Sequence, residues 1–265
     1  AADVGDPGLM AHAIGQHIEA LLRYVSLESA VGDLGSYRRA AHRAGSHTSL
    51  AALHRVLAEA ELKSGRGHRA LRELDLAALH ADATEDAVAR AHLDLARSAA
   101  HGLLGDLPSA LTHAARGVRV AQQSGARTLL RGLSLNLFHA HAQMAAFNDA
   151  TASLAFLRSL GPTSVDGELD IASTELPMAI AIGDRSTADI IEEQFRSVTA
   201  TRQSVAADWY CLARLAYLIS VGRAHEALSI GLARIARSEP TSDRNYLTRL
   251  QVASSDAAVS AGNHH

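Results

Sequence analysis

Fifteen histidines and one cysteine are the residues of this 265-residue chain that could support metal or catalytic chemistry. The histidines form no HExxH motif, and Cys211 stands alone, so no zinc-ligand spacing occurs. His139 and His141 are two residues apart, a spacing that points their side chains in different directions on a helix. His42 and His47 flank a Gly-Ser turn. We therefore expect structural or surface roles for these histidines, an inert buried thiol at Cys211, and neither metal nor cofactor.

The sequence also lacks the motifs of nucleophilic and acid–base catalysis. It has no GxSxG segment of a serine hydrolase and no GxxxxGK[ST] phosphate loop. Acidic groups such as Glu192-Glu193 and Asp82, Glu85 and Asp86 are expected at helix starts or on exposed faces. The sequence thus predicts that the protein is not an enzyme and has no catalytic residues.

The composition favours helices. Apolar residues make up 48% of the chain but aromatic residues only 4%, so most of the apolar residues are alanine and leucine. Both of these residue types prefer helix over strand. The net charge of −3 argues against direct nucleic-acid binding by this chain. No apolar run has the length of a membrane span and no secretory leader opens the chain, so we expect a cytoplasmic protein without membrane contact.

One spacing recurs along the chain: a glycine, or an alanine in its place, precedes an alanine by five positions. The pairs are Gly35/Ala40, Gly65/Ala70, Gly105/Ala110, Ala145/Ala150, Gly183/Ala188 and Gly222/Ala227. After a shorter first interval, from Gly35 to Gly65, the intervals settle at about 40 residues, and Gly262 continues the series beyond Gly222. Periods of about 20 to 50 residues are typical of repeat arrays.

Each unit is expected to contain two helices joined by a short turn. In the third unit Gly105 ends the first helix in a left-handed conformation, Pro108 suits the first turn of the second, and Ala110 allows close helix packing. The predicted fold class is all-α: a right-handed superhelical solenoid of about six helix-turn-helix repeats with a period of about 40 residues. Residues 1–265 are expected to form a single repeat domain that is a fragment of a longer chain.

Two irregularities interrupt the pattern. The first interval is short, so either the hinge at Gly35 is misassigned or the following helix is truncated. Segment 161–177 contains Gly161, Pro162 and Pro177. Because proline bends or starts a helix, either the array bends here or a helix begins near Leu176.

The Gly-to-Ala spacing, with Tyr37, Leu107 or Phe147 between the two positions, resembles the tetratricopeptide repeat. The period of about 40 residues is longer than the roughly 34 residues of that family. It is similar to the sensor array of large LuxR-type ATP-binding bacterial transcription regulators, the maltose-operon activator group. HEAT repeats share the period and remain a structural alternative. The resemblance implies a domain that receives a small inducer or partner protein and acts on other modules of the same regulator.

Polar residues on the first helix of each unit are the candidate ligand-binding residues, because the first helices are expected to line a concave groove. Each group follows helical spacing. The candidates are Asp94, Arg97 and His101, with Ser98, in the third unit; Asn136, His139 and Gln143 in the fourth; and Tyr210, Arg214 and Tyr217 in the sixth. In the sixth unit Trp209, Leu212, Ala216 and Ile219 are expected to form the packed stripe.

Amide, guanidinium and aromatic groups together suit a sugar or a peptide. The same polar stripes are also typical of the solvent-facing side of an amphipathic helix that binds no ligand. Tyr210 and Tyr217 could instead pack on the next unit. The second helices could line the groove instead. The predicted function is a ligand- or partner-sensing domain of a bacterial transcription regulator that binds a small molecule or peptide; a free-standing peptide-binding adaptor is the alternative.

Overall fold

The described part of the chain is entirely helical. The computed structural model describes residues 6–24, 27–161, 163–202, 204–237 and 244–262, and these residues form thirteen helices and no strand. This confirms the all-α prediction. The chain divides into two compact units, residues 1–160 and 161–265, while a single domain over 1–265 stays a prediction.

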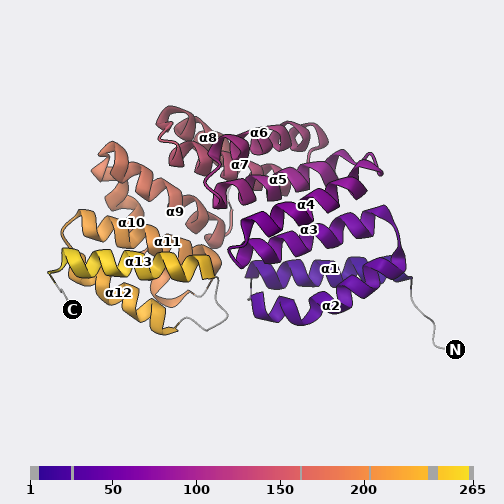
Figure 1. Cartoon of the computed structure of the whole chain (residues 1–265). Helices are drawn as coiled ribbons and strands as arrows, with labels where there is room; N and C mark the ends of the chain where they lie inside the picture. Colours follow the sequence, from indigo (N-terminus) through magenta and orange to yellow (C-terminus); the bar gives the residue numbers. More distant parts are fainter. Residues whose placement is uncertain (1–5, 25–26, 162, 203, 238–243, 263–265) are drawn as a thin grey trace. The chain divides into compact units, whose positions relative to one another are not determined.

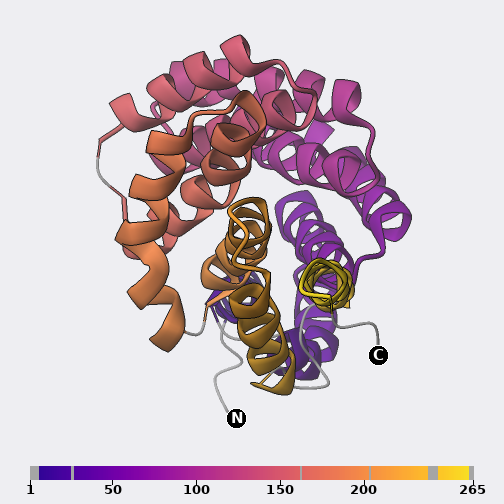
Figure 2. The same cartoon turned by 90° about the vertical axis from the view of Figure 1, so that its left-hand side faces the viewer.

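In both units, helices that follow each other in the sequence lie side by side (Figure 1 and Figure 2). The first unit contains α1 (Pro7–Tyr24), α2 (Leu27–Ala44), α3 (His47–Lys63), α4 (Gly67–Asp82), α5 (Ala87–Leu103), α6 (Leu107–Ser124), α7 (Arg127–Gln143) and α8 (Phe147–Ser159). The second unit contains α9 (Val165–Ile182), α10 (Arg185–Thr201), α11 (Val205–Ser220), α12 (Ala224–Arg237) and α13 (Arg244–Ser260).

The turns of the first unit recur at a fixed interval. From α2 to α8, one residue in each turn has a positive φ, and these residues are twenty positions apart: Gly45, Gly65, Glu85, Gly105, Gly125 and Ala145. In the second unit positive φ angles occur at Gly161 before α9, at Gly183 and Gly222, and at Gly262 after α13. The repeat period of the sequence therefore corresponds to two helices with their two turns.

The turn after α5 shows why this position favours glycine. Gly105 has a φ of 78°, its N–H donates to the carbonyl of Gly102 at 3.1 Å, and the N–H of Asp106 donates to the carbonyl of His101 at 2.9 Å. These two bonds close the helix end in the Schellman pattern, which needs a left-handed residue. Ala145 adopts the same conformation, with a φ of 56°. Alanine thus takes the place of glycine in the fourth unit, as the sequence predicted.

The alanine five positions after each hinge is buried, which confirms its predicted packing role. These alanines are Ala70, Ala110, Ala150, Ala188 and Ala227, and each is at most 2% exposed. A small side chain at this position lets the second helix of a pair approach the first. Pro108 also lies in the first turn of α6, as predicted.

For the two irregular segments, one alternative is confirmed and one is wrong. Gly35 lies inside α2, which confirms that the hinge at Gly35 was misassigned; residues 25–26, where the repeat period places the first turn, lie outside the described residues. Pro177 lies inside α9, which is helical from Val165, so no helix begins near Leu176. The exposed side of α9 accommodates the proline, and the prediction of a bend at segment 161–177 stays untested.

Contacts between helices differ for the odd- and even-numbered members. Within each unit every odd-numbered helix contacts the next odd-numbered helix, as α3 contacts α5 and α9 contacts α11. No comparable contact joins two even-numbered helices in the part of the chain that the structure describes. The odd-numbered helices between the two ends of the chain, α3, α5, α7, α9 and α11, are also more deeply buried than the even-numbered helices, and α3 has no exposed residue between Ser49 and Ser64. These helices therefore form the inner layer of each unit.

Among the described residues, no helix combines the length and the apolar character that crossing a bilayer requires. The predicted cytoplasmic location stays a prediction.

Candidate binding site

Asp94 of α5 lies at the interface with α6 and does not face an open groove. Its side chain is buried, and it accepts hydrogen bonds from His113 at 2.9 Å and from Arg116 Nε at 2.8 Å. Burial alone would raise the pKa of Asp94, but these hydrogen bonds from His113 and Arg116 outweigh burial and hold the pKa below its ordinary value. Asp94 is an ionised partner in an internal ion pair.

The other two candidates of the third unit are also paired within the protein. Arg97 donates to Asp75 of α4 at 2.8 Å. His101 lies 3.1 Å from Asp106, and its ring stacks on that of His113 with 5.4 Å between the ring centres. Both side chains are partly exposed. Asp94, Arg97 and His101 therefore connect α5 to its neighbours, and ligand binding by them stays a prediction.

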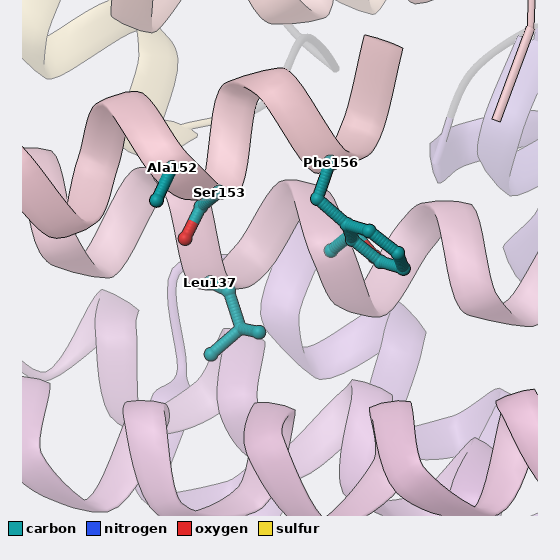
Figure 3. Close-up of a pocket in the computed structure, with 5 residues that line it drawn as sticks. Leu137, Ala152, Ser153 and Phe156 are labelled. Atoms are coloured by element: carbon teal, nitrogen blue, oxygen red, sulfur yellow. The ribbon is translucent and has the colours of Figure 1, made fainter. Parts of the chain in front are cut away.

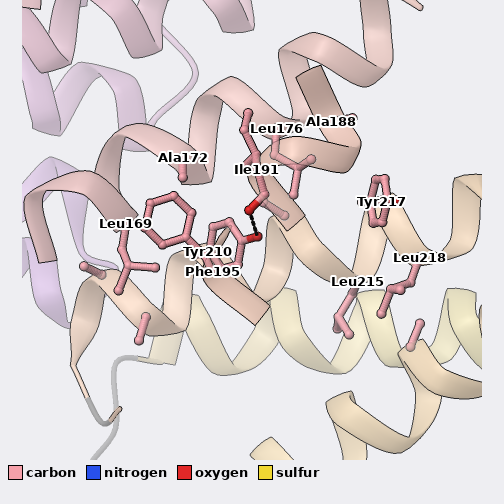
Figure 4. Packing of buried hydrophobic residues seen from close by; sticks show 14 of the residues in the cluster. Leu169, Ala172, Leu176, Ala188, Ile191, Phe195, Tyr210, Leu215, Tyr217 and Leu218 are labelled. Carbon is pink, nitrogen blue, oxygen red and sulfur yellow. Dashed lines mark hydrogen bonds between the residues drawn. The ribbon is translucent and has the colours of Figure 1, made fainter. Parts of the chain in front are cut away.

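The three candidates of the sixth unit are buried, which corrects the prediction that they face a groove. Tyr210 is fully buried and its hydroxyl donates to the carbonyl of Ile191 at 3.2 Å (Figure 4). Arg214 is 8% exposed and donates to Glu192 at 2.9 and 3.0 Å. The hydroxyl of Tyr217 donates to Asp189 at 2.6 Å.

The packed stripe predicted for this helix is confirmed in part: Leu212 and Ile219 pack against the core and Trp209 contacts the ring of Tyr246, but the prediction is wrong for Ala216. The face of α11 that carries Tyr210, Arg214 and Tyr217 packs on α10, while Ala216 is exposed and Trp209 is only half-buried. Arg214 can occupy the core because Glu192 neutralises it there. The prediction that Glu192 lies at a helix start or on an exposed face is wrong too, since it is 4% exposed in the middle of α10.

A sequence signal for these internal pairs exists in the spacing. Because successive turns of the first unit are twenty positions apart, facing side chains near the middle of neighbouring helices are about twenty positions apart, and several internal pairs have separations of 19 or 22. The pairs with this separation are His54–Glu73, Asp94–His113 and Tyr210–Ile191 at 19, and Asp75–Arg97, Asp94–Arg116 and Glu192–Arg214 at 22. Charges at these offsets predict a structural pair rather than a ligand site.

The candidates of the fourth unit lie on α7. Gln143 is exposed, while Asn136 and His139 are half-buried. The side-chain N–H of Asn136 donates to the carbonyl of Leu95 at 3.2 Å, which ties α7 to α5. Of these three candidates, Gln143 is therefore the one whose side chain is exposed.

A pocket opens on the other side of α7, between this helix and α8 (Figure 3). Its volume is about 260 Å³. Its walls are Ser134 and Leu137 of α7 and Ala152, Ser153 and Phe156 of α8, and we call it the α7/α8 pocket. No motif in the sequence marks these residues as a site, because small and apolar side chains between two helices are normally packed.

Three histidines meet at the interface of α3 and α4. His47 Nδ1 lies 3.1 Å from His80 Nδ1, the ring of His54 stacks on that of His80, and His54 lies 2.8 Å from Glu73. Among the described residues no group of three or more histidine, cysteine or acidic side chains could hold a metal ion. Cys211 is buried, and this burial raises the pKa of its thiol to about 11.

Neither the protein-family models nor the curated protein sequences give a match to this chain.

Proposed function

We propose that this chain is a helical-repeat binding domain whose odd-numbered helices line a concave face, in the form of a right-handed superhelical solenoid of about six repeats. The observation that supports it most is the contact between successive odd-numbered helices, which the even-numbered helices do not share to a comparable degree in the described residues. Because successive odd-numbered helices touch one another, they lie closer together than successive even-numbered helices do. Each unit therefore curves with its odd-numbered layer on the inside.

The ligand-accessible part of this face is proposed at α7. Gln143 is exposed there, and Asn136 and His139 precede it at helical spacing. An amide offers both a donor and an acceptor, which suits a sugar hydroxyl or a peptide bond. The proposed ligand is therefore a small polar molecule or a peptide.

The biological role that we propose is sensing in a bacterial transcription regulator of the LuxR-type ATP-binding group. It rests on the repeat period of the sequence and on the resemblance described above. The mechanism would be a population shift: a ligand that contacts the inner face favours one curvature, and this curvature alters contacts with other modules of the regulator. We propose binding and not catalysis for this chain.

A thermal-shift screen across sugars, peptides and nucleotides tests the proposal, since a ligand of the folded state raises its apparent stability. A binding class should raise the melting temperature of the wild type, and Gln143→Ala should abolish that rise. Gln123→Ala, at an exposed glutamine of the even-numbered α6, is the matched control and should keep it. An equal rise in both variants would remove Gln143 from the site.

A further inference from the structure

The α7/α8 pocket lies where the preceding helix pair holds its internal ion pair. One repeat period further along the chain, the positions of Asp94, His113 and Arg116 are taken by Ser134, Ser153 and Phe156. In the α5/α6 pair the carboxylate of Asp94 is buried and bound by both partners. Three side chains of the α7/α8 pair therefore replace a charged cluster with two hydroxyls and a ring.

The pocket is open to solvent, so its volume gives the scale of a ligand that it can partly enclose. Its volume of about 260 Å³ is several times the roughly 30 Å³ of a water molecule. It lies just below the range of about 300 to 1,000 Å³ that drug-sized ligands occupy. A single six-membered ring with one or two substituents fits these limits.

The lining determines the chemistry of the ligand. None of the five lining residues is charged, so a charged ligand would lose hydration without gaining a counter-ion. The hydroxyl of Ser134 donates to the carbonyl of Leu130 at 2.7 Å, which leaves its oxygen as an acceptor for a ligand O–H. The Ser153 hydroxyl projects from α8 toward Leu137, and the ring of Phe156 projects from the next turn of α8 (Figure 3).

We propose that the α7/α8 pocket is a binding site for a small uncharged aromatic alcohol of the phenol class. The ligand ring packs against Leu137 and Phe156, and its hydroxyl donates to Ser134 while it accepts from Ser153. Offset or edge-on contact between two rings favours an aromatic ligand over an aliphatic one of equal size. This site involves the even-numbered α8 and goes beyond the odd-numbered face on which the proposed function depends.

Phenol is the probe, and isothermal titration calorimetry with ligand-observed NMR measures its binding. The wild-type chain should bind phenol saturably with one site, and benzoate, which adds a charge to the same ring, should bind at least tenfold more weakly. Ala152→Trp places a large side chain at an exposed position of the pocket wall, so it should weaken phenol binding at least tenfold. Ala155→Trp, at an exposed alanine of α8 that does not line the pocket, is the matched control and should bind like the wild type.

Ser134→Ala removes the acceptor without adding volume and should weaken phenol binding about fivefold, which keeps the proposal testable if Ala152→Trp does not fold. The proposal is overturned if the wild type shows no saturable binding of phenol, if benzoate binds equally well, or if both tryptophan variants bind alike. Gln143→Ala should leave phenol binding unchanged. A failure at the pocket is therefore distinguishable from a failure of the inner-face site.

Discussion

Exchanging the residue types at two equivalent turns should change stability in opposite directions. Gly105 and Ala145 occupy the same left-handed position after α5 and α7, with φ angles of 78° and 56°. This conformation costs an L residue about 1 to 2 kcal/mol. Glycine avoids this cost at the turn, but it also makes the unfolded chain more flexible, which offsets about 0.4 to 1 kcal/mol of the gain. Ala145→Gly should therefore stabilise the fold by about 0.5 to 1 kcal/mol, and Gly105→Ala should destabilise it by a similar amount.

The structure isolates the conformational cost at Gly105. A β-carbon built there meets no atom within 4 Å, so no steric clash adds to the effect. Urea unfolding followed by far-UV circular dichroism measures the free energy of unfolding for both variants, on the transition of the first unit because both turns lie in residues 1–160. A change of the same sign in both variants would refute the equivalence of the two turns, and with it the repeat register.

Three further perturbations test the internal pairs. Asp94→Asn should lower the free energy of unfolding by about 2 to 3 kcal/mol, because charge-assisted bonds to a buried carboxylate are lost. Since the pKa of Asp94 is lowered in the fold, its stabilisation is present above the ordinary carboxyl pKa and is lost as pH falls through the folded value, so the variant should have a flatter acid limb in urea titrations. Burial and the neighbouring histidines lower the pKa of His80, so stability should fall as pH drops below about 6.5, and His80→Gln should reduce that loss in melting curves between pH 7.5 and 5.5. Arg214→Met should destabilise the second unit more than Arg214→Met combined with Glu192→Leu, because the single variant leaves a carboxylate buried without its partner; calorimetric melting of both would show the order, and a less stable double variant would speak against it.

The helix pairs could be predicted from the sequence because they depend on local rules. A left-handed turn favours glycine and a close helix contact favours alanine, so Gly65 with Ala70 and Gly183 with Ala188 mark their pairs directly. Gly35 followed the same spacing without being a turn, because a glycine and an alanine five positions apart also occur by chance in an alanine-rich helix.

The binding residues could not be predicted in the same way, because a polar side chain can be satisfied by a partner in another helix. In the sequence, Arg214 has the spacing of a ligand-binding residue of α11, but in the structure it donates to Glu192 of α10. A helix that packs on several sides has no single polar stripe, so the solvent side of α11 was assigned to the wrong face. The α7/α8 pocket was missed because its signal is a departure from the preceding pair, Ser134 in place of Asp94.

Central to the proposed function is ligand binding by the odd-numbered inner layer at α7, where Gln143 is exposed. The most direct test is the melting temperature of the wild type and of Gln143→Ala across sugars, peptides and nucleotides. The account predicts that at least one of these classes gives a saturable rise in the wild type and none in the variant. The absence of a saturable rise with every class, or a rise that Gln143→Ala retains in full, would contradict it.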